Sequence, residues 1–329
     1  MTIPGDWQGK TGKGMITIFY KTNGKVMVSQ SETFFANLRR ENVLWIDLLA
    51  PSGDEKHATE AFLDTEIQSR AQAEEIESSS RFSETDKAVF ANTNFLLPGP
   101  EEYYMEAVSF TLVGQTLTTL REVPLRSFTE LQRRIEAMPK QYANGFAVFA
   151  SILEQRVDLD ADMIELMSKE IAQYSKRVNQ QEDINEDFLL DINQLQENTM
   201  LVRENIVDKQ RLVSNFLRSN KYPAALEGRF NVLLQDITSL INHTNFSFER
   251  LEYLQDTVVG LINLEQNKIM KIFTLVSLLL MPPTLVASFY GMNVELPLAG
   301  IKLAWVIIVG IMIISFAVVL YVFKKRRML

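Results

Sequence analysis

The chain of 329 residues contains no cysteine, which excludes disulfide bonds and thiolate metal ligands. Histidine is scarce as well, because His57 and His243 are the only two and neither has the spacing of a metal-binding motif such as His-Glu-x-x-His. A Gly-x-Ser-x-Gly nucleophile motif is also missing. These absences argue against a hydrolase, and we expect neither enzymatic activity nor an organic cofactor.

A complete phosphate-binding loop is missing too, although the N-terminal residues come close to one. Gly5 is separated from Gly9-Lys10-Thr11 by one residue fewer than the motif needs, and no strand precedes it. We therefore expect residues 1–14 to be a flexible N-terminus.

Basic residues are in short supply relative to acidic ones. Asp and Glu number 41 against 33 Lys and Arg, and the net charge is −8. The one basic run, residues 324–327, lies at the C-terminus, so the remainder of the chain is more acidic still. Nucleic-acid binding needs clustered lysine and arginine, and we expect no nucleic-acid partner. An acidic body is compatible with attraction for cations and equally with an ordinary solubilising surface.

Charge is absent from two long stretches near the C-terminus, residues 272–294 and 303–323. A helix that crosses a lipid bilayer needs about 20 such residues, so both stretches predict transmembrane helices. Lys268 and Lys271 precede the first stretch and the basic run follows the second, while the loop between them holds only Glu295 and Lys302 as charged residues. By the positive-inside rule, both ends of the chain are cytoplasmic and the loop faces outward.

Residues 15–126 predict a mixed α/β domain. Two apolar runs, 15–20 and 26–28, are separated by Asn23-Gly24, which is the pattern of a β-hairpin. Residues 43–48 predict a strand, after which a helix begins with Ser52 or Asp54 as its cap. Further strands are expected at residues 88–97, 105–112 and 116–121.

Helical patterns dominate from about residue 127 to the membrane. Apolar residues at steps of three, four and seven predict the seam of a long helix packed on another: Phe188, Ile192, Leu195, Val202, Ile206, Val213 and Phe216. Pro223 ends this helix. Beyond it, one helix of roughly 100 Å is expected from about residue 225 to about 290, because no proline or glycine cluster interrupts residues 229–281. Pro282-Pro283 are expected to free a carbonyl or two within the membrane and to bend the helix.

That long helix carries a second stripe whose members recur every three or four residues: Asn263, Asn267, Met270, Thr274, Ser277, Met281, Thr284 and Ser288. Two interpretations are open. Serine and threonine in membrane helices often bond to their own helix or to a neighbour, which would make the stripe a packing surface. Alternatively, the stripe lines a conduit in which methionines form apolar constrictions. Because residues 272–294 contain no carboxylate, divalent ions in such a conduit would pass largely hydrated.

The segments 259–266 and 282–293, and above all Tyr290-Gly291-Met292-Asn293 at the end of the penultimate span with a basic tail after the last span, resemble the CorA family of magnesium and cobalt transport proteins. The likeness is dense over residues 255–329. It is looser upstream, where residues 45–48, 75–82 and 110–122 are similar to the family's cytoplasmic domain.

The resemblance implies a funnel-shaped homopentamer in the inner membrane, with an α+β cytoplasmic domain, a long α-helical stalk and two transmembrane helices. It implies influx of Mg²⁺, with Co²⁺ or Ni²⁺ as further substrates, driven by the membrane potential. The outer selectivity loop would comprise Gly291, Met292, Asn293 and Glu295, with a ring of Asn293 amides binding a hydrated cation. Residues 296–300 (LPLAG) replace the family's second acidic stretch, which leaves the attraction of cations at this mouth in question.

The remaining implied sites lie in the pore and in the acidic stalk. The pore-lining residues are Asn267, Met270, Thr274, Ser277, Met281, Thr284 and Ser288, of which Asn267, Met270, Met281 and Thr284 match the family by position. Regulatory Mg²⁺ between subunits would be held by Glu84, Asp86 and Asp256. A solvated acidic surface is the alternative for each of those three.

The expected division of the chain follows from these patterns. It comprises a flexible N-terminus (1–14), a cytoplasmic α/β domain (15–126), a long-helix stalk region (127–271), a pore-lining transmembrane helix (272–290), an external loop (291–302), a second transmembrane helix (303–323) and a basic cytoplasmic tail (324–329).

Two other functions remain open at this stage. A zinc transporter of the same architecture, with or without proton coupling, is compatible with the residues, because selectivity by an amide ring depends on geometry. A membrane-anchored coiled-coil scaffold would explain the long helices, but neither the polar stripe nor the short external loop.

Overall fold

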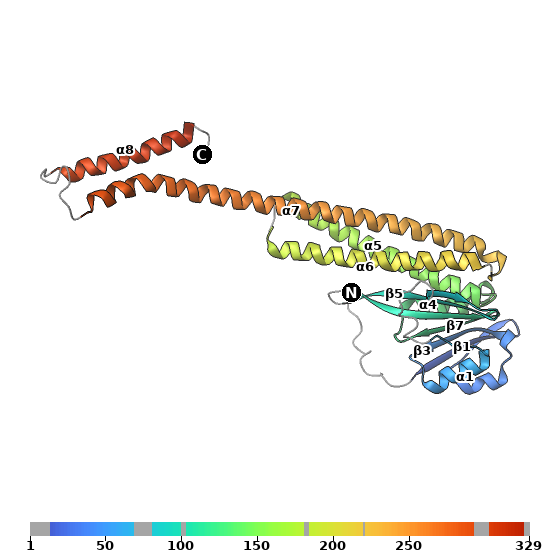
Figure 1. Cartoon of the computed structure of the whole chain (residues 1–329). Coiled ribbons are helices and arrows are strands. Elements are labelled where there is room, and N and C mark those ends of the chain that lie inside the picture. Colours follow the sequence, from blue (N-terminus) through green and yellow to red (C-terminus); the bar gives the residue numbers. More distant parts are fainter. Residues whose placement is uncertain are drawn as a thin grey trace. The chain divides into compact units, whose positions relative to one another are not determined.

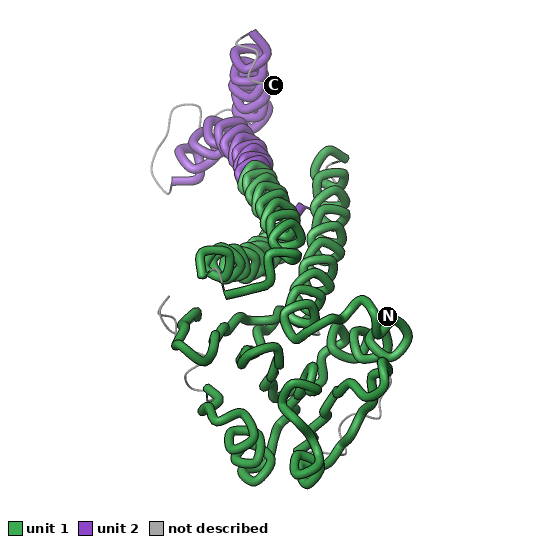
Figure 2. The backbone as a smooth tube through the Cα atoms, turned by 90° about the vertical axis from the view of Figure 1, so that its right-hand side faces the viewer, with its two compact units in different colours: residues 1–182, 186–255 green, residues 183–185, 256–329 purple. Residues whose placement is uncertain are grey.

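The computed structural model describes residues 14–68, 81–99, 103–180, 184–219, 221–292 and 303–325. The chain divides into two compact units, one formed by residues 1–182 and 186–255 and the other by residues 183–185 and 256–329 (Figure 2). The near match to a phosphate-binding loop at residues 5–11, in the N-terminus expected to be flexible, lies outside the described residues.

The first unit is built on a seven-stranded sheet in the order β2-β1-β3-β7-β6-β5-β4. The strands are β1 (Met15–Thr22), β2 (Lys25–Ser29), β3 (Val43–Leu49), β4 (Phe82–Glu84), β5 (Ala88–Pro98), β6 (Tyr103–Val113) and β7 (Thr116–Arg121). The pair β3 and β7 is parallel and every other pair is antiparallel. All the strands predicted from sequence are present.

The first hairpin forms for the predicted reason. Asn23 and Gly24 have φ values of 51° and 75°, the left-handed pair that a two-residue turn between twisted strands requires. The turn joins β1 to β2 with Thr22 opposite Lys25.

Helices cover both faces of the sheet (Figure 1). On one face, α1 (Gly53–Leu63) and the 3₁₀ helix η1 (Glu32–Asn37) close a core that includes Ile16, Ile46 and Leu48. The helix α1 begins with a capping box, in which the Ser52 hydroxyl accepts from the Glu55 amide and the Glu55 carboxylate accepts from the Ser52 amide. Ser52 is therefore the cap.

The other face is covered by α4 (Arg126–Ala137), α5 (Gly145–Gln180) and α6 (Glu186–Ser219). Strand β3 sends Trp45 to this side, where its ring stacks on Phe19 and approaches Phe128 of α4. The predicted seam of α6 is confirmed, since each of its seven members is no more than 4% exposed. Two short 3₁₀ helices, η2 (Arg40–Asn42) and η3 (Pro139–Gln141), lie in the connections.

Two of the upstream segments that are similar to the family, residues 45–48 and 110–122, meet across the parallel strands β3 and β7. Arg121 of β7 donates to both carboxylate oxygens of Asp47 on β3, at 3.1 and 2.8 Å, and Asp47 also accepts from Thr119 and Gln132. Arg121 and Asp47 are 4% and 1% exposed. This satisfied, buried ion pair gives both motifs a structural role.

A single helix, α7 (Glu227–Tyr290), follows the 3₁₀ turn η4 (Ala224–Leu226) and includes Pro282 and Pro283 without a break. This confirms the predicted long helix. The second unit contains the C-terminal part of α7 and the helix α8 (Ala304–Lys325), which runs back alongside it (Figure 1). By length and composition both helices are apolar enough to cross a membrane, with mean hydropathies of 1.9 and 3.0 over an 18-residue window of each.

Candidate functional site

The partly polar stripe of α7 is exposed along its whole length in the chain. Its eight members are Asn263, Asn267, Met270, Thr274, Ser277, Met281, Thr284 and Ser288, and none is even half-buried. At roughly 100° of rotation per residue, they fall within about 100° of arc on one side of the helix.

The opposite side of α7 is the one that is half-buried. Leu275, Leu279, Pro282, Val286 and Tyr290 make a line about 150° around the helix from the stripe. The helix α8 has a matching line of half-buried or buried residues, Ile308, Met312, Ser315, Val319 and Phe323. The polar stripe therefore lies away from this half-buried side, on the larger part of α7 that is exposed together with apolar side chains such as Phe273 and Leu285.

Both threonines of the stripe bond back to their own helix. The Thr274 hydroxyl donates to the Met270 carbonyl at 2.8 Å, and the Thr284 hydroxyl donates to the Leu280 carbonyl at 2.7 Å. Back-bonding of this kind consumes the hydroxyl proton and leaves the oxygen lone pairs as acceptors. The packing interpretation anticipated these hydrogen bonds. They also leave both side chains as oxygen acceptors, and contact with a cation requires oxygen acceptors.

The two methionines of the stripe separate these polar levels. Met270 is 62% exposed and Met281 is 68% exposed, like other large apolar side chains of this helix such as Leu285 at 71%. Next to Met281, Pro282 and Pro283 have no amide hydrogen, so the carbonyls of Leu278 and Leu279 lack their i+4 donors. The stripe therefore alternates apolar methionines with polar side chains, and the carbonyl freed at Leu279 belongs to the half-buried side of the helix.

The helix ends at the predicted loop. The Gly291 amide donates to the Ala287 carbonyl at 2.9 Å, and the Met292 amide donates to the Phe289 carbonyl at 3.4 Å. Gly291 does not have a positive φ, but a Cβ at this position would lie only 3.1 Å from the Ala287 carbonyl oxygen. The remaining loop residues, Asn293 and Glu295, lie outside the described residues.

The three acidic residues singled out for regulation are all exposed. Glu84 ends β4 opposite Val89, Asp86 lies in the turn before β5, and Asp256 lies on α7 in the second unit. Within the described ranges, no group of three or more His, Asp or Glu side chains is placed to hold a metal ion. Whether these acids bind Mg²⁺ between subunits stays a prediction.

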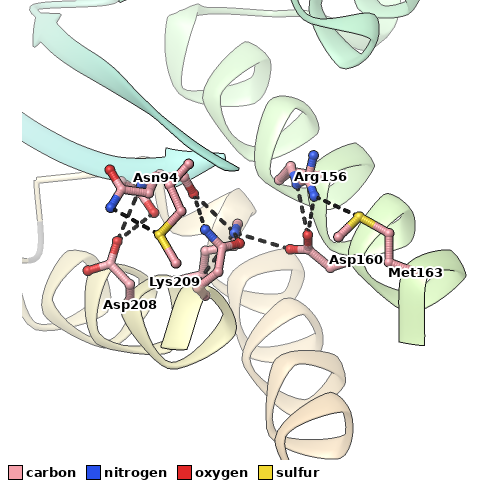
Figure 3. A network of polar contacts seen from close by, with 9 residues as sticks. Asn94, Arg156, Asp160, Met163, Asp208 and Lys209 are labelled. Atoms are coloured by element: carbon pink, nitrogen blue, oxygen red, sulfur yellow. Dashed lines mark hydrogen bonds and ion pairs between the residues drawn. The ribbon is translucent and has the colours of Figure 1, made fainter. Parts of the chain in front are cut away.

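Sequence reasoning missed a buried polar network between α5, α6 and β5 (Figure 3). Lys209 is 0% exposed, and its Nζ lies 3.1 Å from Asp160 Oδ2 and donates to the Asn94 carbonyl at 3.2 Å and to the Asn205 side chain. Arg156, one turn before Asp160 on α5, also pairs with this carboxylate.

Burial lowers the pKa of Lys209 from 10.5 to about 8, although the Asp160 carboxylate partly opposes this shift by raising the pKa. A sequence signal was available, because position 209 stands in the apolar seam between Ile206 and Val213. A lysine in such a seam needs a buried anion from another element.

Comparisons with known proteins agree with the sequence resemblance. The family described as CorA-like Mg²⁺ transporter protein matches residues 40–325. The magnesium transport protein CorA of Campylobacter jejuni (strain RM1221) is 33% identical over 324 residues, covering 95% of this chain and 99% of that protein.

Solved structures support the fold. The complete CorA magnesium transporter of Methanocaldococcus jannaschii superposes with a TM-score of 0.76 at 16% identity, covering 96% of this chain and 98% of that one. The ZntB cytoplasmic domain of Vibrio parahaemolyticus superposes with a TM-score of 0.58 at 17% identity, covering 77% of this chain and 99% of that domain.

Proposed function

This chain belongs to the CorA family of Mg²⁺ transporters, and on that premise we propose that it is a homopentameric channel that admits Mg²⁺, and also Co²⁺ or Ni²⁺, across the inner membrane. The observation that carries the proposal is the exposed polar stripe on α7. Exposing hydroxyl and amide groups to lipid is unfavourable, and a ring of five such helices would turn the stripes toward a common axis instead. The α8 helices would then form the outer, lipid-facing layer.

The conduit would handle the ion as a hydrated species. Asn267, Thr274, Ser277, Thr284 and Ser288 supply neutral oxygens, and residues 272–294 include no carboxylate that could replace the tightly held water of Mg²⁺. At the outer end, a ring of Asn293 amides would receive the hydrated ion, with Met292 supporting the loop and Glu295 adding negative charge. Met270 and Met281 would form apolar constrictions that close by dewetting.

The membrane potential is a sufficient driving force for entry. It contributes about 2.3 kcal/mol per elementary charge per 100 mV, and twice that for a divalent ion. No nucleotide hydrolysis is needed, in keeping with a family of transporters rather than enzymes. Both chain ends would be cytoplasmic, and Glu84, Asp86 and Asp256 would bind Mg²⁺ at subunit contacts and favour the closed state.

Uptake into liposomes tests the proposal. Purified protein reconstituted with an inside-negative potential is expected to take up Mg²⁺, Co²⁺ and Ni²⁺ without a proton gradient, and collapse of the potential should slow entry. Because the residues are also compatible with a zinc transporter of this architecture, Zn²⁺ is the second candidate substrate. Uptake of Zn²⁺ alone, or uptake only with a proton gradient, would replace the magnesium assignment by the zinc one.

Met281→Asp is expected to slow Mg²⁺ flux by at least about tenfold, because a carboxylate ring binds the ion and adds ~1.4 kcal/mol or more to its escape. The measurement is the initial rate of uptake in the same liposomes. Met281→Leu keeps an apolar side chain of similar volume and should conduct nearly as the natural chain does. Faster flux through Met281→Asp would place Met281 outside the conduit.

A further inference from the structure

The first unit contains a cavity of about 870 Å³ between α6 and the β5 and β6 strands, whose lining the ion pathway does not use. Its wall is formed mainly by one face of α6, from Met200 to Arg218. The size is that of a pocket for a small organic ligand.

One end of this cavity is rich in arginine, although the chain as a whole is acidic. Arg211 and Arg218 both line it and stand seven residues apart, which places them on the same helix face about 10 Å apart. Neither makes an ion pair or a hydrogen bond with any residue in the described ranges. Arg81 lies on the same cavity from the sheet side. Guanidinium groups bind phosphate oxygens through paired hydrogen bonds.

The floor of the cavity is rigid and its acidic group is already neutralised. Asp208 accepts from the Thr93 hydroxyl at 2.9 Å and lies 3.6 Å from Arg81 Nε. Asn205, 1% exposed, donates to the Asn94 carbonyl at 2.7 Å, and Figure 3 shows Asn94, Asp208 and Lys209 in this arrangement. Of the carboxylates on the cavity wall, Glu204 is thus the one that remains exposed.

The other end of the cavity has apolar, flexible side chains beside Arg203 and Glu204. Met105 of β6 and Met200 and Val207 of α6 line it, and the Asn94 side-chain amide lies 3.7 Å from the Met105 sulfur. Thioethers make favourable contacts with flat aromatic rings. The cavity therefore offers two guanidinium groups at one end. At the other end it offers a thioether surface, flanked by amide groups, for an aromatic ring of a ligand.

We propose that this cavity binds a nucleotide, with its phosphates on Arg211 and Arg218 and its base against Met105 and Met200. The arginines and Mg²⁺ compete for the same phosphate oxygens, so the site takes the Mg²⁺-free nucleotide. Provided that the chain transports Mg²⁺ as proposed above, occupancy of the site then reports a shortage of Mg²⁺ on the cytoplasmic side.

Equilibrium binding of ATP to the full-length protein in detergent tests this proposal. ATP should bind saturably without Mg²⁺ and more weakly when Mg²⁺ is in excess. Arg211→Gln/Arg218→Gln should weaken ATP binding at least about tenfold, since two charge-assisted contacts are lost. Arg39→Gln/Arg133→Gln removes the same charge from two exposed arginines outside the cavity and should leave binding unchanged.

A second variant tests the apolar end. Met200→Ala should weaken binding of ATP by about twofold to tenfold, and binding of inorganic tripolyphosphate not at all. Absence of saturable ATP binding, or equal binding by the Arg211→Gln/Arg218→Gln variant, overturns the proposal. So does loss of the oligomer in that variant, because the cavity would then be a subunit contact. None of these outcomes depends on whether the protein transports Mg²⁺.

Discussion

Asn293→Ala is expected to reduce Mg²⁺ uptake by at least about a hundredfold while the oligomer stays intact. In a pentamer the substitution removes five amide oxygens from one ring, and each hydrogen bond to the hydrated ion is worth ~1 kcal/mol. The loop follows the end of α7 at Tyr290 in the sequence, so the substitution leaves every residue of the apolar core of the first unit unchanged. The measurement is the initial uptake rate in liposomes, normalised to the reconstituted protein.

The control for this prediction separates conduction from assembly. Asn37→Ala removes an exposed asparagine in the first unit and should leave both uptake and oligomer size unchanged. Light scattering on the Asn293→Ala protein should give the same mass as the natural chain. Undiminished Mg²⁺ flux in this variant would show that the loop does not select the ion.

Asp160→Asn is expected to destabilise the first unit by about 3–5 kcal/mol. The substitution keeps the shape of the side chain, but it leaves Arg156 and Lys209, both buried, without the carboxylate that pairs with them. The measurement is the unfolding of the full-length protein in detergent, followed by loss of helical circular dichroism with denaturant.

Asp158→Asn is a matched control on the same helix. Partial burial and the neighbouring carboxylates of Glu154, Asp162 and Asp236 raise the pKa of Asp158, so its charge is unfavourable and its neutralisation should not lower stability. If Asp160→Asn were as stable as this control, the buried network would not hold α5, α6 and β5 together.

The pH dependence of unfolding provides a second readout of the network. The pKa of Lys209 is about 8 in the folded chain and 10.5 is its ordinary value, so between these limits the unfolded chain binds more protons. The free energy of unfolding should therefore rise with pH across that window. Because the Asp160 charge raises the pKa of Lys209, Asp160→Asn should move the lower limit of the window below pH 8.

The sequence by itself determined the elements and the membrane segments, because these depend on local patterns. Asn23-Gly24 fixed a turn, the apolar seam from Phe188 to Phe216 fixed a buried helix face, and the uncharged stretches fixed the two apolar helices. The stripe of α7 was also readable, since residues spaced by three and four share one face of any helix. The loop motif and the family resemblance rest on the same kind of contiguous information.

The tertiary structure decided what depends on residues far apart in the chain. Only the packing of α6 on β5 places Lys209 beside Asn94, and only the parallel pairing of β3 with β7 gives Arg121 its partner Asp47. Coordinates were also needed to place the stripe: its residues lie away from the half-buried side of α7, and the hydroxyls of Thr274 and Thr284 are satisfied within their own helix, while a role in lining a conduit stays a prediction. The physical reason is that burial and partner choice are set by which elements pack together, and no local spacing in the sequence encodes that.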